Sequence, residues 1–345
     1  MRTGVSWDNG PCSAHLSIHW RAVRISLPPG HDGSPAGVLC CGNAVLDILV
    51  RPVAEPGWGK TTWVDSIEQA LGGNGGNTSF ALARLGVPTR LLSAVGEDAF
   101  GERVLSILGA EGVDTRWIAR LPLPTPTTVV LVRPDGVRAL LHQPGASREA
   151  FSEPIEMSSE LVEGCSRFHL GNVFALQKLQ PHAAALLQGA KRYGLQTSVD
   201  TGWDAQGRWM AILGDCLPHT DLLFVNEDEA AQLTGMQHAE AAARILQEHG
   251  ARTVVIKLGA SGCVVAQGGE QFQVPAFRVP VVDTTGAGDS FAGGFLAALQ
   301  RGACLREAAR FANALGALSV RALGGTTGLL TYEATREWIS ASLDA

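Results

Sequence analysis

The stretch DTTGAGDSFAGGF (283–295) contains the residues best suited to chemistry. A strand is expected to end near Val282, Gly286–Gly288 form a predicted turn, and apolar residues then recur at helical spacing. Such a turn at a helix start directs several backbone N–H groups and the positive end of the helix dipole at one point, which suits an anion. Asp289 stands at the mouth of this anion site, where a carboxylate can accept the proton of a hydroxyl that attacks a phosphate. The alternative is that Asp289 only caps the helix.

The elements that must position these residues alternate between strand and helix types. An apolar run of strand type, Val38–Val50, opens the globular part. Further strands are expected at 90–95, 167–170, 196–200, 221–225 and 253–258. Helices are expected at 77–85, 99–109, 179–193 and 239–249. This alternation predicts an α/β fold with a mostly parallel sheet covered on both faces, in which ligands bind at the carboxyl ends of the strands.

Two segments, at about 50–67 and 122–143, interrupt the alternation. The first is extended and broken by polar residues. The second contains a predicted hairpin, Thr127–His142, with a turn at Pro134–Gly136. A hairpin inserted in a parallel α/β protein must pack elsewhere, so these segments predict a small accessory sheet. It is either a lid over the site or an edge hairpin without a role in function.

Composition excludes several classes of protein. The 345 residues are enough for one large α/β domain or for two smaller domains. A net charge of −6, without a long basic run, argues against a nucleic-acid partner, and no apolar run reaches the ~18 residues of a membrane span. Seven scattered cysteines without a CxxC pair exclude zinc-finger spacing. Because residues 1–37 lack the apolar stretch of a signal peptide, we expect a loose tail and a cytoplasmic protein, with a transit peptide as the alternative for the tail.

Two motifs together resemble the signatures of the PfkB, or ribokinase-like, carbohydrate kinase family. DTTGAGDSFAGGF resembles the carboxyl-terminal signature, and LGGNGGNTSFALARLG (71–86) matches the amino-terminal GG-x-x-x-N cluster, about 200 residues earlier. The resemblance covers the chain from about Val38 to its end and implies a kinase domain over 38–345. The implied fold is a three-layer α/β/α sandwich with a small β-sheet lid. The implied activity is transfer of a phosphoryl group from ATP, with Mg²⁺, to a hydroxymethyl group of a sugar.

The resemblance also assigns roles to individual residues. Asp289 would be the catalytic base, and the anion hole would be formed by Gly286, Ala287 and Gly288. The sugar would be bound by Asp47, which is expected just after the first strand, and by Gly72, Gly73 and Asn77. The structural alternatives are a turn or capping role for Asp47 and a helix cap for Asn77.

A second group of residues would hold the nucleotide and its metal. NEDE (226–229) supplies Asn226 and Glu229, of which Glu229 would act on magnesium through water, although the pair also fits a helix capping box. Around the ATP phosphates, ribose and adenine the resemblance implies Lys257, Gly259, Gly262 and Asn313. A monovalent cation, potassium, would use Asp283 and Thr285 with carbonyls near Ser319, Ala322 and Gly324.

Several alternatives stay open on the same fold. A nucleoside kinase would need an aromatic wall near the lid, for which Trp58, Trp63 and Trp117 are candidates, although core packing explains them better. A kinase for a phosphorylated sugar would need cations, available from Arg51, Lys60, Arg90, Arg133 and Arg138. A sugar or nucleotide sensor without catalysis is the alternative from another class. Family members often pair their lids between subunits, so a homodimer is expected.

One segment departs from the family pattern. Many members carry an Asp-x-Asn-x-Arg-like run after a middle strand, which here reads VDTGWDAQGRW (199–209). Asp200 is kept, but Trp203 stands at the arginine position. This weakens assignment to a subgroup such as ribokinase and leaves the catalytic centre untouched. WGKTT (58–62) is not a P-loop, because Ala54 falls where the leading glycine should be.

Overall fold

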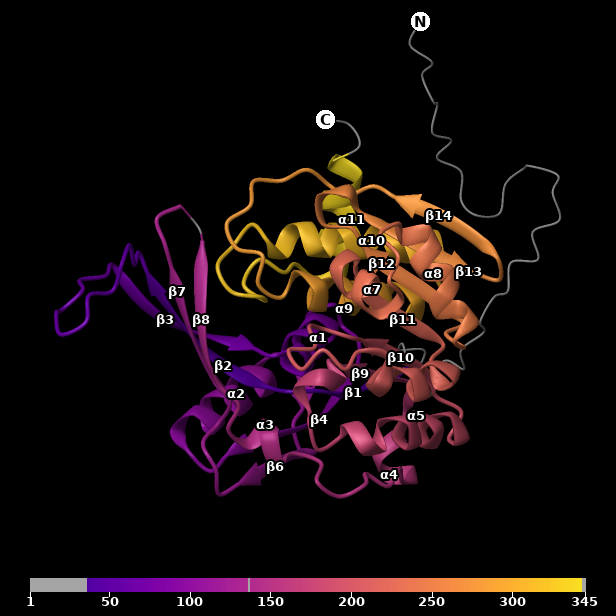
Figure 1. The fold of residues 1–345 in the computed structure, drawn as a ribbon, viewed down its shortest axis with the longest axis horizontal. Coiled ribbons are helices and arrows are strands. Elements are labelled where there is room, and N and C mark those ends of the chain that lie inside the picture. Colours follow the sequence, from indigo (N-terminus) through magenta and orange to yellow (C-terminus); the bar gives the residue numbers. More distant parts are fainter. Residues whose placement is uncertain (1–35, 136, 343–345) are drawn as a thin grey trace, which may run out of the picture.

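A large, mostly parallel sheet forms the centre of the computed structural model, which describes residues 36–135 and 137–342 (Figure 1). Its strand order is β14-β13-β12-β11-β10-β9-β1-β4-β5, with β6 also paired to β4. All pairs from β12 to β5 are parallel, and β13 and β14 add an antiparallel edge. The strands are β1 (Gly37–Cys41), β4 (Thr89–Gly96), β5 (Val113–Asp114), β6 (Ile118–Leu121), β9 (Cys165–Gly171), β10 (Gln196–Asp200), β11 (Leu222–Asn226), β12 (Thr253–Lys257), β13 (Cys263–Gln267) and β14 (Glu270–Val274).

Helices cover both faces of this sheet, as the alternating pattern predicts. In β1, Val38 and Cys40 belong to one buried apolar cluster, whereas Leu39 and Cys41 belong to another. The first cluster contains residues of α1 (Asn74–Arg84), α2 (Ala99–Ala110), α9 (Ala287–Gln300) and α10 (Leu305–Ser319). The second contains residues of α5 (Ala183–Arg192), α7 (Glu227–Thr234) and α8 (Ala239–Glu248). Shorter helices are α3 (Ala146–Glu149), α4 (Ser159–Val162) and α6 (Met210–Leu213), and α11 (Tyr332–Ala341) is the last. The three-layer α/β/α sandwich is therefore confirmed.

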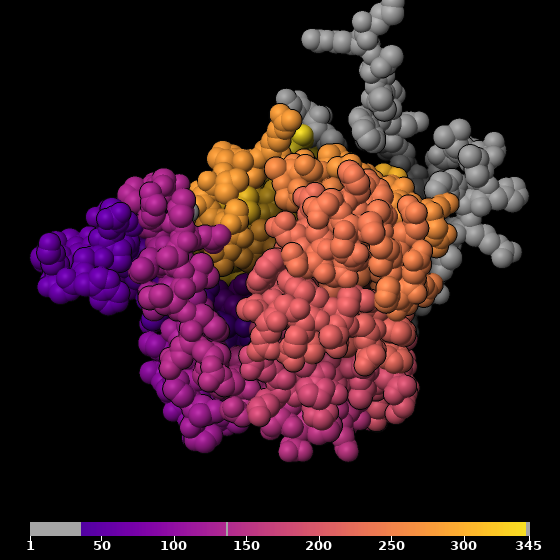
Figure 2. Space-filling model, viewed as in Figure 1, coloured from indigo at the N-terminus to yellow at the C-terminus, as the bar shows by residue number. Residues whose placement is uncertain are grey.

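The small accessory sheet is also confirmed. Its order is β3-β2-β7-β8, formed by β2 (Val45–Arg51), β3 (Ser66–Gly72), β7 (Thr127–Val132) and β8 (Arg138–Gln143). It stands beside the body of the molecule, and a hollow lies between the magenta β7–β8 hairpin and the orange part of the chain (Figure 2). Trp58 and Trp63, in the loop between β2 and β3, are 100% and 90% exposed, so core packing is wrong for both. Trp117 packs against the second buried cluster.

Three predicted elements differ from the structure. The run Val38–Val50 is two strands in different sheets, because the chain breaks at Gly42, where a Cβ would lie 2.7 Å from the Cα of Gly75 in α1. The helix expected at 179–193 is a 3₁₀ turn, Gln180–His182, followed by α5. No strand ends near Val282 in the described chain; residues 275–286 are irregular and Val282 is 50% exposed.

Two sequence expectations bear on the location of the protein. Within the described ranges, no helix is long and apolar enough to cross a membrane. The expected tail, 1–37, lies almost wholly outside the described residues, so its interpretation stays a prediction.

Candidate active site

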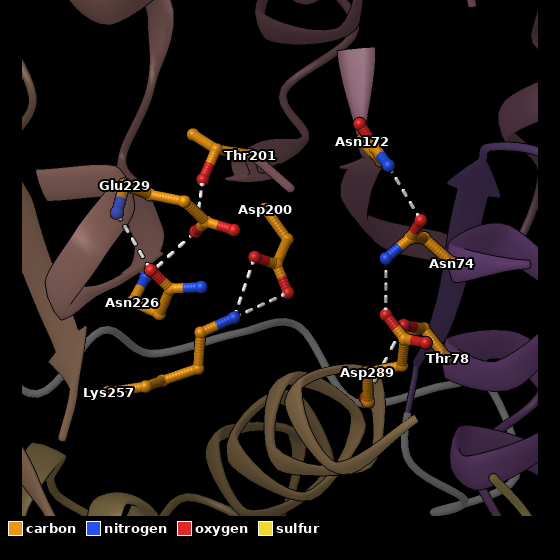
Figure 3. Close-up of polar contacts among 9 residues, drawn as sticks. All are labelled: Asn74, Thr78, Asn172, Asp200, Thr201, Asn226, Glu229, Lys257 and Asp289. Atoms are coloured by element: carbon orange, nitrogen blue, oxygen red, sulfur yellow. Dashed lines mark hydrogen bonds and ion pairs between the residues drawn. The ribbon is translucent and has the colours of Figure 1, made fainter. Parts of the chain in front are cut away.

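Polar residues from five elements meet at the carboxyl ends of the central strands (Figure 3). Asp200, Asn226 and Lys257 are the last residues of β10, β11 and β12, and Asn172 directly follows β9. Asp289 faces them from the first turn of α9. Because parallel strands end at one edge of a sheet, residues far apart in the sequence form one site, as the fold class predicts.

Asp289 is buried and accepts a hydrogen bond on each carboxylate oxygen. Asn74 Nδ2 donates to Oδ1 at 2.7 Å, and Asn77 Nδ2 donates to Oδ2 at 2.8 Å. Burial raises the pKa of Asp289, whereas the two amides and the nearby Lys257 ammonium act in the opposite direction. Because the N-cap of α9 is Gly286, Asp289 does not cap this helix, and the capping interpretation of Asp289 is wrong.

The start of α9 supplies the predicted anion site. Gly286 has a φ of 68°, and a Cβ there would lie 2.6 Å from the Cα of Gly325, so both the backbone conformation and the close approach require glycine. A Cβ on Gly288 would lie 3.2 Å from Lys257 Nζ. The lysine ammonium therefore lies beside the backbone N–H groups of the first helical turn, and both favour an anion at this point.

Lys257 forms a buried ion pair with Asp200. Its Nζ lies 2.8 Å and 3.0 Å from the two carboxylate oxygens. Burial raises the pKa of Asp200 to about 7, against the effect of the ammonium. Burial also disfavours the charged form of Lys257, but the carboxylates of Asp200 and Glu229 hold the pKa of the lysine above its usual value. Asp200 is the residue of the family pattern that this sequence keeps, and its partner in the structure is Lys257.

Asn226 and Glu229 form the helix capping box that the sequence allowed. The Asn226 side chain accepts from the Glu229 backbone N–H, Glu229 Oε2 accepts from the Asn226 backbone N–H, and both distances are 2.8 Å. The Thr201 hydroxyl also donates to Glu229 Oε2, at 2.8 Å. In the described part of the chain, no three His, Cys, Asp or Glu side chains form a metal cage. This donor set fits Mg²⁺ held through waters and nucleotide phosphates, with Glu229 acting at a distance.

Asp47 faces the same site from the accessory sheet. It lies within β2 and is buried, so the interpretation of Asp47 as a turn residue after a strand is wrong. Burial raises its pKa to about 6; the Thr128 hydroxyl lowers it, and the charges of Asp283 and Asp289 raise it. A Cβ on Gly72 would lie 2.5 Å from Asp47 Cγ, so Gly72 leaves the space that this carboxylate occupies.

Asn77 is the fourth predicted sugar ligand. It lies inside α1, whose N-cap is Gly73, so the helix-cap interpretation of Asn77 is wrong. Its Nδ2 contacts Asp289, and its Oδ1 is buried without a hydrogen-bond partner among the described residues. A buried acceptor without a donor is costly, and a ligand hydroxyl would satisfy it.

The residues expected at a monovalent cation site lie together around Asp283. Its Oδ1 accepts from the Thr285 N–H at 2.9 Å, and its Oδ2 accepts from the Gly324 N–H at 2.9 Å. Its own N–H donates to the Val320 carbonyl, between Ser319 and Ala322. Arg138 from β8 forms a 2.5 Å ion pair with Asp283 Oδ1. This guanidinium already places a positive charge beside the oxygens that are expected to hold a monovalent cation, and the cation site stays a prediction.

The remaining residues that are expected around the nucleotide are Gly259, Gly262 and Asn313. Gly259 lies in a short 3₁₀ turn after β12, with no atom of the described residues within 4 Å of an added Cβ. Gly262 has a φ of 94° and packs against the Val274 carbonyl, so its glycine is required by the backbone. Asn313 is buried, and its amide donates to the carbonyls of Val274 (3.0 Å) and Pro275 (3.2 Å). Asn313 therefore ties the loop after β14 to α10.

The five cations considered for a phosphorylated substrate are mostly placed elsewhere. Arg51 pairs with Glu68 and Arg133 with Asp135. Arg90 pairs with Asp114. Lys60 lies in the exposed loop between β2 and β3. Arg138 alone of the five contacts residues of the predicted site.

Sequence reasoning did not assign three contributors to the site. Asn74 contacts Asp289, Asn172 Nδ2 donates to Asn74 Oδ1 at 2.8 Å, and Thr201 contacts Glu229. Asn74 had a signal, because it lies three residues before Asn77 in the GGNGGN cluster, on the same side of the helix. Asn172 had no local signal. Trp203, at the departure from the family pattern, is 57% exposed and packs on Trp209.

The chain is similar to known proteins in sequence and in fold. The model of the pfkB family carbohydrate kinases matches residues 38–331. The ribokinase of Haemophilus influenzae is 31% identical over 306 residues, which cover 86% of this chain and 95% of that protein. The structure of Arabidopsis thaliana ribokinase complexed with ribose and ATP has a TM-score of 0.77 at 28% identity, covering 88% of this chain and 98% of that one. A putative ribokinase II from E. coli, in complex with ATP and Mg²⁺, has a TM-score of 0.76 at 26% identity, covering 89% and 99%.

Proposed function

The chain belongs to the PfkB family of carbohydrate kinases and is an ATP-dependent kinase of that family, and from this premise we propose that it phosphorylates the hydroxymethyl group of a free sugar with Asp289 as the general base. The observation that carries the proposal is the meeting of Asp47, Asn77 and Asp289 on one side of the anion site at the start of α9. A sugar held by the first two residues presents a hydroxyl to the third, beside the point where a phosphoryl group is held.

The sugar is oriented before the reaction. Asp47 accepts hydrogen bonds from two sugar hydroxyls, and the Asn77 Oδ1 that lacks a partner among the described residues accepts another. A Cβ on Gly72 would meet the Asp47 carboxylate, and one on Gly73 would lie 2.6 Å from the Asn43 carbonyl oxygen, so the two glycines make room for these groups and not for the sugar. Fixing the reacting hydroxyl in this way replaces a collision between two molecules by a reaction within one complex, which is worth several powers of ten in rate.

Phosphoryl transfer then uses the start of α9. The sugar oxygen forms a bond to the γ-phosphorus of ATP, the bond from that phosphorus to the bridging oxygen of ADP breaks, and the hydroxyl proton passes to Asp289. The backbone N–H groups of Gly286–Gly288 and the Lys257 ammonium stabilise the charge on the moving phosphoryl group. Mg²⁺, when bound with ATP, would neutralise phosphate charge, with Glu229 and Asn226 ordering its waters.

The test is coupled ADP release with ATP and magnesium across a panel of sugars and nucleosides. We expect selective turnover of one sugar, with the phosphate attached to its primary hydroxyl. The matched control is the analogue of that sugar without the primary hydroxyl, which must bind without turnover. Turnover of nucleosides alone would show that the substrate on this fold is a nucleoside and not a free sugar. ATP binding without turnover of any compound would favour a sensor and refute the proposal.

The accessory sheet is proposed as the contact surface of a homodimer. Ile67 of β3 and Leu141 of β8 are 66% and 61% exposed and lie on the same face of this sheet, where a second copy would cover them. Light scattering at micromolar concentration should give twice the mass of one chain. A monomeric mass, the same for the original protein and for Leu141→Lys, would contradict the dimer.

A further inference from the structure

The amide that contacts the proposed base is itself held by a second amide. Asn74 Nδ2 donates to Asp289 Oδ1 at 2.7 Å, and Asn74 Oδ1 accepts from Asn172 Nδ2 at 2.8 Å (Figure 3). The three side chains come from α1, α9 and the end of β9, so the arrangement is produced by the tertiary fold. It leads from the end of a central strand to the carboxylate that takes the proton.

Asn172 is fixed from several directions. Its backbone has the left-handed conformation, with φ 55° and ψ 71°, which asparagine adopts more readily than most residues. Its N–H donates to the Asp200 carbonyl at 2.7 Å, and its Oδ1 accepts from the Ala175 N–H at 3.2 Å. A Cβ on Gly202 would lie 2.5 Å from Asn172 Cγ, so a glycine leaves the space for this side chain. With Oδ1 engaged by Ala175, Nδ2 is the end that faces Asn74.

This orientation decides what Asn74 can offer to Asp289. A side-chain amide has a donor end and an acceptor end. Its donor end stabilises an ionised carboxylate, whereas its acceptor end would stabilise a protonated carboxyl group. Because Asn172 donates to the acceptor end of Asn74, only the donor end faces Asp289. We propose that Asn172 and Asn74 are positioning residues that keep Asp289 in its ionised, proton-accepting form.

The proposal rests on the kinase function proposed above, in which Asp289 must accept a proton. The charged groups that face Asp289 are Lys257 of β12, Glu229 of α7, Asp200 of β10 and Asp47 of β2. All four are present in every variant below. A change in the titration of Asp289 therefore reports on the amide pair, once the charge that the test variant introduces has been subtracted.

Asn172→Asp is the decisive variant, because a structural role and a positioning role predict different results. Aspartate accepts the left-handed conformation and still accepts from the Ala175 N–H, so the local structure is kept. Its carboxylate cannot donate, so Asn74 must turn its donor end toward residue 172 and its acceptor end toward Asp289. We expect the acid limb of kcat/KM against pH to move up by about one pH unit or more, which is about tenfold lower activity below that limb.

Asn74→Leu removes the amide at similar size without adding charge, and it should move the acid limb in the same direction. In Asn74→Leu/Asn172→Asp, the second substitution acts only through the new charge. We therefore expect its shift to be clearly smaller there than in the protein with Asn74. If Asn172→Asp shifts the acid limb equally with Asn74 present and with Leu at position 74, residue 172 acts only through the introduced charge, and the proposal is overturned. An unmoved acid limb in both single variants would do the same.

A measurement without turnover separates this proposal from the proposed function. The pKa of Asp289 can be followed by ¹³C NMR of aspartate-labelled protein, with the resonance assigned by its loss in Asp289→Asn. A raised pKa in both single variants, in a protein that turns over no sugar, would support the amide pair and refute the proposed phosphorylation of a sugar. An unchanged pKa in an active kinase would refute the amide pair alone.

Discussion

Replacing Asp47 by asparagine should stabilise the protein while removing its sugar binding. The carboxylate is buried with a pKa of about 6, compared with the ordinary value of 3.8. Between these two values the unfolded chain loses its proton and the folded protein keeps it, so stability falls as the pH rises from about 4 to about 6. Above pH 6 the full cost is present. Asparagine has nearly the same shape, keeps an acceptor for the Thr128 hydroxyl and carries no charge to bury.

The size of the effect follows from the difference between the two pKa values. Each pH unit corresponds to 1.36 kcal/mol, so a difference of about two units gives roughly 3 kcal/mol at pH 7.5. At pH 5 the unfolded chain is ionised but the folded carboxylate is still protonated, and the same linkage relation gives about 1.5 kcal/mol. For a chain of this length, the value at pH 7.5 corresponds to a rise in Tm of roughly 5 °C.

Urea unfolding of the original protein and of Asp47→Asn, at both pH values, measures this difference directly. Sugar binding, measured by calorimetry in the same samples, should be lost in the variant. A carboxylate can accept a hydrogen bond on each oxygen, whereas the amide has one acceptor end and one donor end and cannot accept from two hydroxyls in the same way. A variant that is no more stable than the original protein at pH 7.5, or a gain in stability that is equal at pH 5 and pH 7.5, would refute the cost assigned to burying the Asp47 carboxylate.

Two further substitutions test the sugar side and the lid. Gly72→Ala should raise the KM for the sugar at least tenfold with little change in the KM for ATP, because its Cβ would lie 2.5 Å from Asp47 Cγ. The control is Gly109→Ala, at an open helical position, which should stabilise the protein by about 0.5–1 kcal/mol. Steady-state kinetics and urea unfolding distinguish these results, and an unchanged sugar KM in Gly72→Ala would contradict the site. Arg138→Met removes the ion pair that joins β8 to Asp283, so the lid should be cut faster by protease in the absence of sugar and the sugar KM should rise severalfold. Unchanged proteolysis would show that the ion pair does not hold the lid.

The sequence predicted those parts of the site that depend on local chemistry. A glycine-rich turn followed by a helix requires the backbone conformation that Gly286 adopts, and the capping box of Asn226 and Glu229 is defined by a spacing of three residues. The hairpin Thr127–His142 follows from two short apolar segments on either side of a turn. In each case the residues that determine the structure are neighbours in the chain.

The remainder depends on contacts that local patterns do not contain. Val38–Val50 has the composition of one strand, and its division into β1 and β2 results from the close approach of α1 to Gly42. Asn172 has a role only because β9, β10 and α1 meet at the same edge of the sheet. Arg138 appeared in the sequence as one of five candidate cations, and its pairing with Asp283, 145 residues away, depends on how the accessory sheet packs against the rest of the chain.

The most direct test of the account is Asp289→Asn, measured for binding and for turnover in the same preparation. The amide keeps the shape of the side chain and cannot accept the proton of the sugar hydroxyl. We expect the affinities for ATP and for the sugar, measured by calorimetry, to stay within a few-fold, while turnover falls by about 10²–10⁴-fold or more. Near-normal turnover in Asp289→Asn would contradict the assignment of this carboxylate as the base.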